Sequence, residues 1–385
     1  MTNSRRTAAF IVLAWLRTKE FPSAMLPEGP DRAFVQDLVY TVLRRLRALR
    51  RVLGVLVPKW PKGELEALLY VGAAQILYME DVPDYAAVNE TVEAAKLCPN
   101  GAVAKVVNGV LHNLIRRRDE FARMLASAPV AERESFPNEL VRRWIVRFGE
   151  AAAAELCAWH NRPAETFLAR SDGSFVALER GRRVADVPGY VEGAFIVQDP
   201  GTRIAVDLLG VVPGDEVLDA CAAPGGKTVQ LAWRGANVTA CEVNPRRRRR
   251  LEENLRRLKL EVEVVGALPV AAARTFAKVL VDAPCSNTGV LRRRPDARWN
   301  WSAERLQALV KLQAGILDLV APLVAPGGTL VYSTCSNEPE ENSDQVGAFL
   351  ARHPDFALAE SQESVPCQTG HDGAFAAKLV RQSSK

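Results

Sequence analysis

The sequence predicts an α/β protein in which a mostly parallel, doubly wound sheet follows an all-helical N-terminal domain. In the N-terminal third, apolar residues recur at three- and four-residue spacing, as in "RAFVQDLVYTVLRRLRALRRVLGVLV" (32–57), which is typical of amphipathic helices. From about residue 203, short apolar runs alternate with helical segments, which is typical of a parallel sheet covered on both faces. A length of 385 residues also fits two or more domains better than one.

Proline- and glycine-bearing breaks predict the domain boundaries. Residues 1–125 contain helical stretches separated by "PKWPKG" (58–63), "EDVPDY" (80–85) and "LCPNG" (97–101), which indicates a small helical bundle. The first twenty residues have helical spacing and lack a small-residue cleavage site, so we expect an amphipathic helix rather than a signal peptide. We assign residues 126–200 to a linker and a short, irregular subdomain, and residues 201–385 to the α/β domain.

Five strands are expected in the α/β domain. They are "EVLDAC" (216–221), "NVTACE" (237–242), "EVEVV" (261–265), "AKVLVDAP" (277–284) and "GTLVYST" (328–334). In such sheets, ligands bind outside the carboxyl ends of the strands. Cys285 and Cys335 directly follow the last two strands. Both thiols are therefore expected on the functional rim of the sheet.

The composition excludes several classes of protein. The seven cysteines are scattered, with no CxxC pair and no Cys/His cluster, so we expect neither a disulfide framework nor a metal site. No uninterrupted apolar run reaches the eighteen or so residues that span a bilayer. We therefore expect a cytoplasmic protein that is not membrane-bound.

Arginine is concentrated in a few stretches. Formal net charge is +5, and the dense stretches are "LRRLRALRR" (43–51), "IRRRDE" (115–120), "NPRRRRRLEENLRRLK" (244–259) and "LRRRPDARW" (291–299). Such runs are commonly solvated helix faces, but arginine is also well suited to phosphate recognition, so we favour nucleic acid as a partner. Arg292, Arg293, Arg294 and Arg298, beside Cys285, are the better RNA candidates, whereas residues 246–250 fit either interpretation equally.

A glycine-bearing turn joins the first predicted strand to a helix in "LDACAAPGGKTVQLA" (218–232). There, backbone amides at a helix N-terminus can approach a ligand closely. The turn is neither a P-loop nor a GxGxxG dinucleotide motif. Glu242 ends the second strand, a position from which an acid can hold ribose hydroxyls. We predict a nucleoside-type cofactor on these residues: Cys221, Ala222, Ala223, Pro224, Gly225, Gly226, Lys227 and Glu242.

Three longer motifs are more specific. "DACAAPGGKT" (219–228), "DAPCSNTGVLRRRPDARW" (282–299) and "YSTCSNEPEEN" (332–342) resemble the RNA 5-methylcytosine methyltransferases of the Sun/RsmB and Nop2 type. The N-terminal helices resemble the NusB-like RNA-binding domain of the Sun/RsmB enzymes. The resemblance implies a Rossmann-like class I methyltransferase domain, S-adenosyl-L-methionine as cofactor, and methylation of cytosine C5 in ribosomal RNA, with one cytidine of 16S rRNA as the expected target.

The chemistry explains why thiols are needed. Cytosine C5 is a poor nucleophile, and addition of a thiolate at C6 turns it into an enamine carbon that can accept a methyl group. The resemblance implies that Cys335, which follows Thr334, attacks C6 and that Cys285 helps to complete the reaction. It also implies that Asp282 hydrogen-bonds the base or the methionine amine. We expect a monomer that binds RNA, and neither DNA nor a membrane.

The chain departs from the family pattern at two places. The stretch between "HNRP" (160–163) and "VQDPG" (197–201) is short for the RNA-recognition subdomain that this family carries there. An acid expected after the third strand is absent, since Gly266 and Ala267 stand there.

Several other interpretations remain open. They are a non-enzymatic RNA-binding assembly factor, which cofactor binding would distinguish, and a dithiol redox protein, which thiol titration would distinguish. A methyltransferase acting on tRNA or 23S rRNA is a third. Related DNA enzymes use the cysteine of the Pro-Cys motif as nucleophile, so the reverse assignment of Cys285 and Cys335 is also open.

Overall fold

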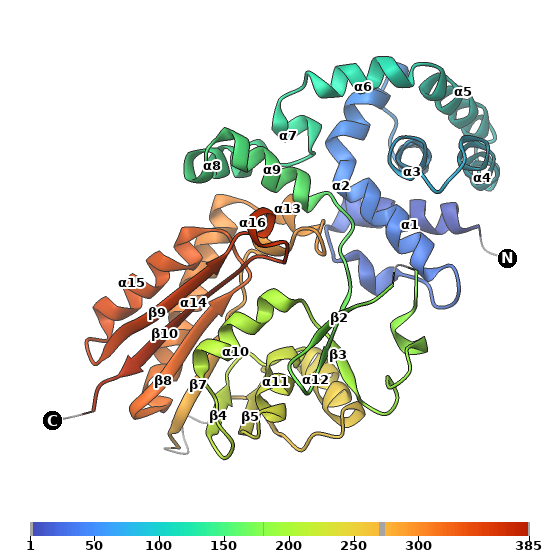
Figure 1. Cartoon of the computed structure of the whole chain (residues 1–385). Helices are drawn as coiled ribbons and strands as arrows, with labels where there is room; N and C mark the ends of the chain where they lie inside the picture. Colours follow the sequence, from blue (N-terminus) through green and yellow to red (C-terminus); the bar gives the residue numbers. More distant parts are fainter. Residues whose placement is uncertain (1–2, 180, 269–273, 384–385) are drawn as a thin grey trace. The chain divides into compact units, whose positions relative to one another are not determined.

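A computed structural model describes residues 3–179, 181–268 and 274–383, and contacts divide the chain into two compact units (Figure 1). The first unit comprises residues 1–162 and 294–301, and the second comprises residues 163–293 and 302–385. The helical unit therefore extends beyond the predicted boundary at 125. It also includes eight residues that belong, in sequence, to the α/β domain.

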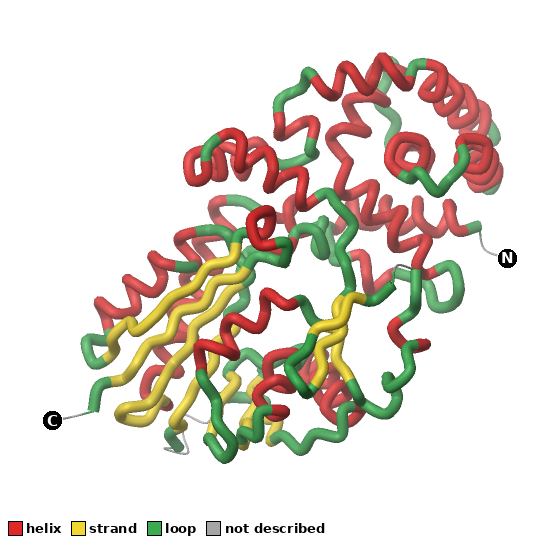
Figure 2. The backbone as a smooth tube through the Cα atoms, viewed as in Figure 1, coloured by secondary structure: helices red, strands yellow, loops and turns green. Residues whose placement is uncertain are grey.

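The first unit is helical throughout (Figure 2). Its helices are α1 (Ser4–Thr18), α2 (Arg32–Leu56), α3 (Glu64–Tyr78), α4 (Asp84–Lys96), α5 (Ala102–Arg116), α6 (Arg118–Ala126), α7 (Val130–Arg133), α8 (Asn138–Phe148), α9 (Glu150–His160) and α13 (Ala297–Asn300), with a short 3₁₀ turn η1 (Pro22–Met25). The side chain of Asn3 accepts hydrogen bonds from the backbone N–H groups of Arg5 and Arg6 and so caps α1. The apolar faces of α1 to α6 share one core.

Close helix packing in this core depends on one glycine. A Cβ atom on Gly72 of α3 would lie 2.5 Å from Cδ1 of Leu111 on α5, so only glycine lets these helices approach so closely. Residues 126–200, which we assign to a linker and a subdomain, begin with α7, α8 and α9. Phe136 and Trp144 are buried there, with ring centroids 5.6 Å apart.

The second unit is built on a seven-stranded sheet in the order β6-β5-β4-β7-β8-β10-β9. Its strands are β4 (Glu216–Asp219), β5 (Asn237–Cys241), β6 (Glu263–Val265), β7 (Phe276–Asp282), β8 (Val324–Thr334), β9 (Phe356–Ser364) and β10 (Ala374–Arg381). The first five strands in spatial order pair in parallel, whereas β10 runs antiparallel to both β8 and β9. All five predicted strands are confirmed, as is the mostly parallel, doubly wound fold class.

Five helices cover the two faces of this sheet. They are α10 (Arg203–Leu209), α11 (Gly226–Trp233), α12 (Pro245–Arg257), α14 (Ala303–Val320) and α15 (Ser343–Arg352). The second unit also contains α16 (Pro366–Thr369) and the 3₁₀ turns η2 (Val184–Asp186), η3 (Pro200–Thr202), η5 (Thr288–Val290), η6 (Ala321–Leu323) and η7 (Pro339–Glu341). Residues of α10 and α11 share one core with Val217 and Val331, whereas residues of α14 and α15 share another with Leu218 and Leu330. Because successive strand residues point to opposite faces, α10 and α11 lie opposite α14 and α15.

A small antiparallel sheet precedes the large one. Its strands are β1 (Phe167–Arg170), β2 (Phe175–Ala177) and β3 (Phe195–Val197), in the order β2-β1-β3. Ala169 and Ile196 of this sheet share a core with Leu251 and Leu255 of α12. The shortened segment between 161 and 200 therefore forms a compact subdomain that packs against α12.

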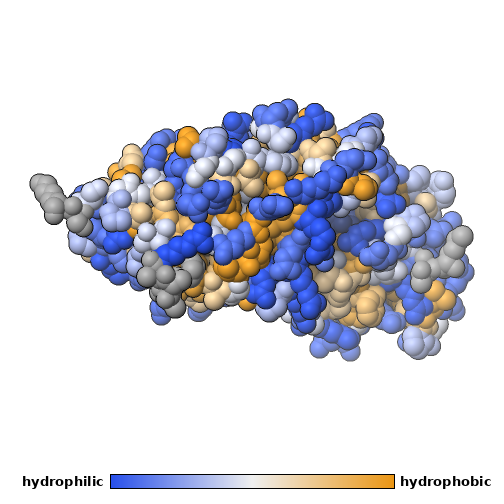
Figure 3. All heavy atoms as spheres, turned by 90° about the horizontal axis from the view of Figure 1, so that it is seen from below, coloured by the Kyte–Doolittle hydropathy of each residue, from blue (hydrophilic) through white to orange (hydrophobic). Residues whose placement is uncertain are grey.

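One segment, Ala303–Leu323, is long and apolar enough to cross a membrane by length and composition alone. It consists of α14 and η6, and its residues Leu317, Val320 and Ala321 belong to the core beneath the sheet. Packing against the sheet accounts for these buried residues of the segment. On the face drawn in Figure 3, hydrophobic atoms lie in patches between hydrophilic ones.

Candidate active site

The two rim thiols lie against each other. Strands β7 and β8 pair in parallel with Asp282 opposite Ser333, so the loops that follow them leave the sheet side by side. The Sγ atoms of Cys285 and Cys335 are 3.3 Å apart. A single substrate atom can therefore be reached by both sulfur atoms.

Backbone contacts hold the two thiol loops together. The Gly289 N–H donates to the carbonyl oxygen of Cys335 at 2.9 Å, and a Cβ atom on Gly289 would lie 2.8 Å from that oxygen. Asn287, with a φ of +61°, accepts from the Cys335 thiol at 3.4 Å and donates to the carbonyl oxygen of Cys285 at 2.9 Å. Asn287 tolerates this left-handed conformation better than most residues. These contacts fix the positions of both sulfur atoms.

The surroundings of Cys285 favour its protonated form. The contact with the Cys335 thiol, followed by burial and the Glu341 carboxylate, raises the pKa of Cys285. Glu341 is fully buried and accepts from the Ser286 N–H at 2.9 Å and from the Gln313 side chain at 2.9 Å. Ser286 directly follows Cys285, so the hydrogen bond from its N–H to Glu341 also orients the start of the Cys285 loop.

The predicted cofactor turn leads from β4 into α11. Gly225 has a φ of +109°, and a Cβ atom there would lie 2.7 Å from Cδ1 of Leu251, so both backbone conformation and space require glycine. The peptide bond between Ala223 and Pro224 is cis. The first N–H groups of α11 have no partner within the helix, so they can bind an acceptor group of a ligand.

Lys227 and Asp282 join this turn to the thiol loops. Nζ of Lys227 lies 2.6 Å from Oδ2 of Asp282, and the Ser333 hydroxyl donates to Oδ1 of Asp282 at 2.9 Å. Burial lowers the pKa of Lys227, but the adjacent Asp282 carboxylate outweighs burial, and the net result is a raised pKa. The structure thus brings the predicted residues Lys227, Asp282, Cys285 and Cys335 into one connected site.

Asp219 is a site residue that the sequence analysis missed. It is 1% exposed at the end of β4, and its Oδ2 accepts from the Thr228 hydroxyl at 2.6 Å. Its Oδ1 has no hydrogen-bond partner among the described residues. Burial raises the pKa of Asp219 to about 6. The predicted strand continues to residue 221, whereas β4 ends at Asp219, so the strand-end rule used for Glu242 did not single it out.

This pKa predicts a pH-dependent stability. Between about pH 4 and pH 6 the unfolded chain releases the Asp219 proton while the folded chain retains it, so stability falls as pH rises. A difference of about two pH units corresponds to about 3 kcal/mol. Relative to Asp219→Asn, the wild-type free energy of unfolding should therefore decrease by roughly that amount from about pH 4 to about pH 7, in urea titrations without cofactor. A difference that does not vary with pH would contradict a raised pKa.

Glu242 lies at the end of β5, as predicted, and is 4% exposed. Its Oε1 accepts from the Asn244 N–H at 2.8 Å, and its Oε2 lies 3.3 Å from Nε of Arg247. The next residue, Val243, is apolar yet 69% exposed. The acid expected after the third strand is absent at Gly266. The Arg248 guanidinium fills the space that a side chain at position 266 would need. Residues 269–270, which also follow the third strand, lie outside the described residues.

Of the four arginines predicted to contact RNA, Arg292 and Arg298 are buried and Arg293 and Arg294 are half-buried and ion-paired, which corrects that prediction. Arg292 is 3% exposed, 3.7 Å from Asp372. Arg293 forms ion pairs with Asp199 at 2.7 Å and with Asp372. The Arg294 side chain is 36% exposed and pairs with Asp296 at 3.0 Å. These side chains hold loops together because their charge is neutralised within the protein.

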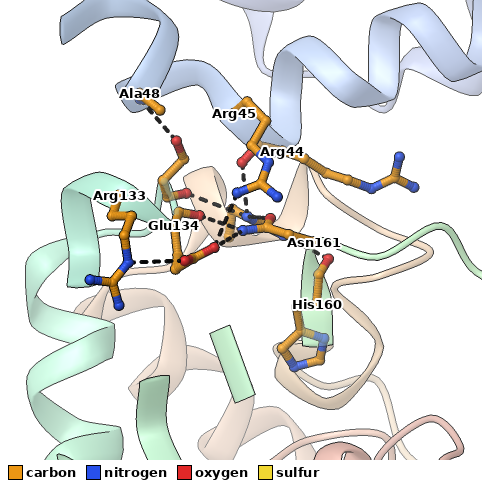
Figure 4. Close-up of polar contacts among 9 residues, drawn as sticks. Arg44, Arg45, Ala48, Arg133, Glu134, His160 and Asn161 are labelled. Carbon is orange, nitrogen blue, oxygen red and sulfur yellow. Dashed lines mark hydrogen bonds and ion pairs between the residues drawn. The ribbon is translucent and has the colours of Figure 1, made fainter. Parts of the chain in front are cut away.

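Arg298 is fully buried within the first unit. Its guanidinium donates to Oδ1 of Asn161 at 2.8 Å and to the carbonyl oxygens of Arg44, Ser135 and His160 at 3.2, 3.4 and 3.2 Å. Asn161 in turn donates to Oε2 of Glu134 at 3.0 Å, within the cluster in Figure 4. Arg298 is therefore a structural residue that cannot reach a phosphate in this state.

Two protein-family models match this chain, one in its N-terminal part and one in its C-terminal part. Residues 206–380 match the family model described as 16S rRNA methyltransferase RsmB/F, and residues 2–116 match the NusB family. A ribosomal RNA small subunit methyltransferase B from Erwinia tasmaniensis is 34% identical over 427 aligned positions, covering 99% of each chain. The chain belongs to the RsmB/F family of 16S rRNA methyltransferases. The resemblance drawn from the three sequence motifs is therefore confirmed.

Other comparisons agree with membership of the RsmB/F family. A second ribosomal RNA small subunit methyltransferase B, from Salmonella arizonae, is 36% identical over 91% of each chain. Among solved structures, PH0851 superposes with a TM-score of 0.78 at 20% identity over 98% of both chains. NSun6 from Pyrococcus horikoshii, solved with SFG, has a TM-score of 0.56 at 18% identity and covers 65% of this chain. The two structures support the fold alone, because their identities are low.

Proposed function

We propose that this RsmB/F methyltransferase transfers a methyl group from S-adenosylmethionine to cytosine C5 of ribosomal RNA, through a covalent bond between Cys335 and cytosine C6. The observation that carries the proposal is the pair of thiols at neighbouring strand ends, 3.3 Å apart and connected through Asp282 to the cofactor turn. A reaction that needs one nucleophilic sulfur and one assisting group fits this arrangement.

The contact between the two thiols is compatible with this division of roles. The Sγ atom of Cys285 lies 3.3 Å from that of Cys335, close enough to pass a proton to it. Cys335 loses its proton to water, adds to C6 as a thiolate and makes C5 nucleophilic. Once C5 carries its methyl group, a water molecule takes the C5 proton and the C5–C6 double bond re-forms as the sulfur–C6 bond breaks. Cys285 can then donate its proton to the departing Cys335 sulfur.

The cofactor fits the residues present in the site. The turn from Cys221 to Lys227 offers backbone N–H groups, and the unpartnered Oδ1 of Asp219 can accept from a bound amine. Glu242 lies where ribose hydroxyls are held in sheets of this type, and exposed Val243 can cover an adenine ring. S-adenosylmethionine supplies the methyl group. Asp282 can accept from the cytosine amino group or from the methionine amine.

Loss of Glu242 should weaken cofactor binding. Glu242→Ala removes charge-assisted hydrogen bonds to the ribose and should cost about 1.5–3 kcal/mol of binding free energy in calorimetry. Glu252→Ala on α12, which removes only an ion pair with Arg248, is the matched control and should retain wild-type affinity. Unchanged cofactor affinity in Glu242→Ala would remove this residue from the site.

The substrate is proposed as one cytidine of 16S rRNA, because the curated relatives are small subunit methyltransferases and the chain aligns with them along nearly its full length. Residues 1–125 would contribute RNA affinity as a NusB-like domain. A ribosomal substrate places the enzyme in the cytoplasm, where we expect it to act as a monomer without binding DNA or membranes. Bisulfite sequencing of ribosomal RNA from a deletion strain tests the target. An unmethylated site in 23S rRNA or tRNA, with 16S rRNA unchanged, would reassign the substrate.

A further inference from the structure

Helix α12 is unusually rich in positive charge. Its 13 residues include seven arginines and two glutamates, a net charge of +5, which equals the formal net charge of the whole chain. Five of these arginines are consecutive, at 246–250, and the first turn of the helix contains no acid. Most of the net charge of the chain is therefore concentrated on one short helix.

Three of the seven arginines have structural roles. Arg247 donates to the carbonyl oxygen of Ala223 at 2.9 Å and pairs with Glu242. Arg248 lies 3.8 Å from Glu252, and Arg257 donates to the carbonyl oxygens of Tyr190 and Phe195 at 2.9 and 3.0 Å. The Arg247 contacts attach α12 to the cofactor turn, and the Arg257 contacts attach it to the small subdomain.

The other four arginines have no such role. Arg246, Arg249, Arg250 and Arg256 are exposed, and none of them has a side-chain hydrogen bond or an ion pair to another described residue. At 100° per residue they fall on one side of α12, opposite the buried side that contains Leu251 and Leu255. We call these four residues the α12 arginine stripe.

Folding alone does not explain the stripe. Cations near a helix N-terminus face the positive end of the helix dipole, so arginines in the first turns are unfavourable. Like charges three and four residues apart, such as Arg246 with Arg249 and Arg250, also destabilise a helix. The buried leucines of α12 would form the same core without these charges. A polyanion bound along the stripe would relieve the repulsion.

We propose that the α12 arginine stripe binds the phosphate backbone of the RNA substrate beside the target cytidine. This inference rests on the proposed function. Helix α12 begins three residues after Glu242, and Asn254 donates to the carbonyl oxygen of Pro224 at 2.8 Å, so the helix adjoins the cofactor turn along much of its length. From Arg246 to Arg256 the stripe extends for about 15 Å, enough to contact several phosphates. It supplies the accessible positive charge that Arg292, Arg293 and Arg298 do not.

The test compares two variants that each lose two positive charges. Arg249→Gln with Arg250→Gln removes half of the stripe. Arg305→Gln with Lys311→Gln removes two exposed cations from α14, on the opposite face of the sheet. Binding to single-stranded poly(C) RNA is measured as a function of salt concentration. Each lost phosphate contact should reduce the slope of log K against log salt by about 0.7, so the stripe variant should lose about 1.4 and bind on the order of tenfold more weakly at 0.1 M salt.

The outcomes separate this inference from the proposed function. A reduced slope in the stripe variant, with the control at the wild-type slope and S-adenosylmethionine affinity unchanged in both, supports the inference. Equal slopes in wild type and stripe variant, with methyl transfer intact, would overturn the inference alone. Equal reductions in both variants would also overturn it, since net charge would then explain the change. Vesicles containing phosphatidylserine that bind the wild type but not the stripe variant, with RNA binding unchanged, would assign the stripe to a membrane surface. Absence of both RNA binding and methyl transfer in the wild type would overturn the proposed function as well.

Discussion

Cys335→Ala should abolish methyl transfer and should form no covalent complex with RNA. Without the Cys335 sulfur, no bond to cytosine C6 forms, C5 keeps its aromatic character, and the methyl group has no nucleophile to attack. The expected effect is a loss of activity below detection, because Cys335 supplies the sulfur that adds to C6. Incorporation of labelled methyl groups and denaturing gels of protein–RNA mixtures measure the two results.

Cys285→Ala should behave differently. Cys335 can still attack and the base can still be methylated, but the adduct should resolve slowly without the adjacent proton donor. A denaturant-resistant protein–RNA complex that requires S-adenosylmethionine should accumulate. Cys98→Ala, in the helical unit, is the matched control and should show wild-type turnover. An adduct in the Cys335 variant and none in the Cys285 variant would reverse the assignment, as in the related DNA enzymes.

Arg298→Ala should strongly destabilise the helical unit. The substitution removes a fully buried guanidinium and leaves Oδ1 of Asn161 and three backbone carbonyl oxygens without this donor. The guanidinium also lies 3.9 Å from the ring centroid of Phe136, so a cation–π contact is lost. Leaving a buried acceptor without a donor typically costs about 1–3 kcal/mol for each group, so the total loss should be several kcal/mol. Urea unfolding followed by tryptophan fluorescence should show a correspondingly lower midpoint.

Arg116→Ala is the control for this effect. Arg116 is exposed in the same unit, and its side chain donates only to Asn113, so its loss should change stability by less than about 0.5 kcal/mol. Should Arg298→Ala unfold at the same urea concentration as Arg116→Ala, the buried network would contribute little. Arg298 could then be reconsidered as a residue that leaves its site to contact RNA.

Local patterns were sufficient for the second unit and for most of the candidate site. The five parallel strands were predicted because apolar runs and turn residues are set by short-range periodicity. The turn that contains Gly225 and the two rim thiols could be located because each directly follows a strand. Asp219 was not singled out, because the predicted strand continued to residue 221 whereas β4 ends at Asp219. The prolines near α7 and α8 resemble a linker, although the compact helical unit continues to residue 162.

The residues at the carboxyl ends of the strands can be identified from local sequence, because strand identity depends on neighbours within a few positions. Which arginines are available to a partner depends on tertiary packing. "LRRRPDARW" (291–299) and the start of α12 (Pro245–Arg257) look alike in composition, yet Arg298 is fully buried whereas Arg249 is exposed. The acceptors that bury Arg298 come from residues 44, 135, 160 and 161, more than 130 positions away in the chain. A guanidinium can leave water only where such acceptors converge, and that convergence is created by packing between distant segments rather than by any local pattern.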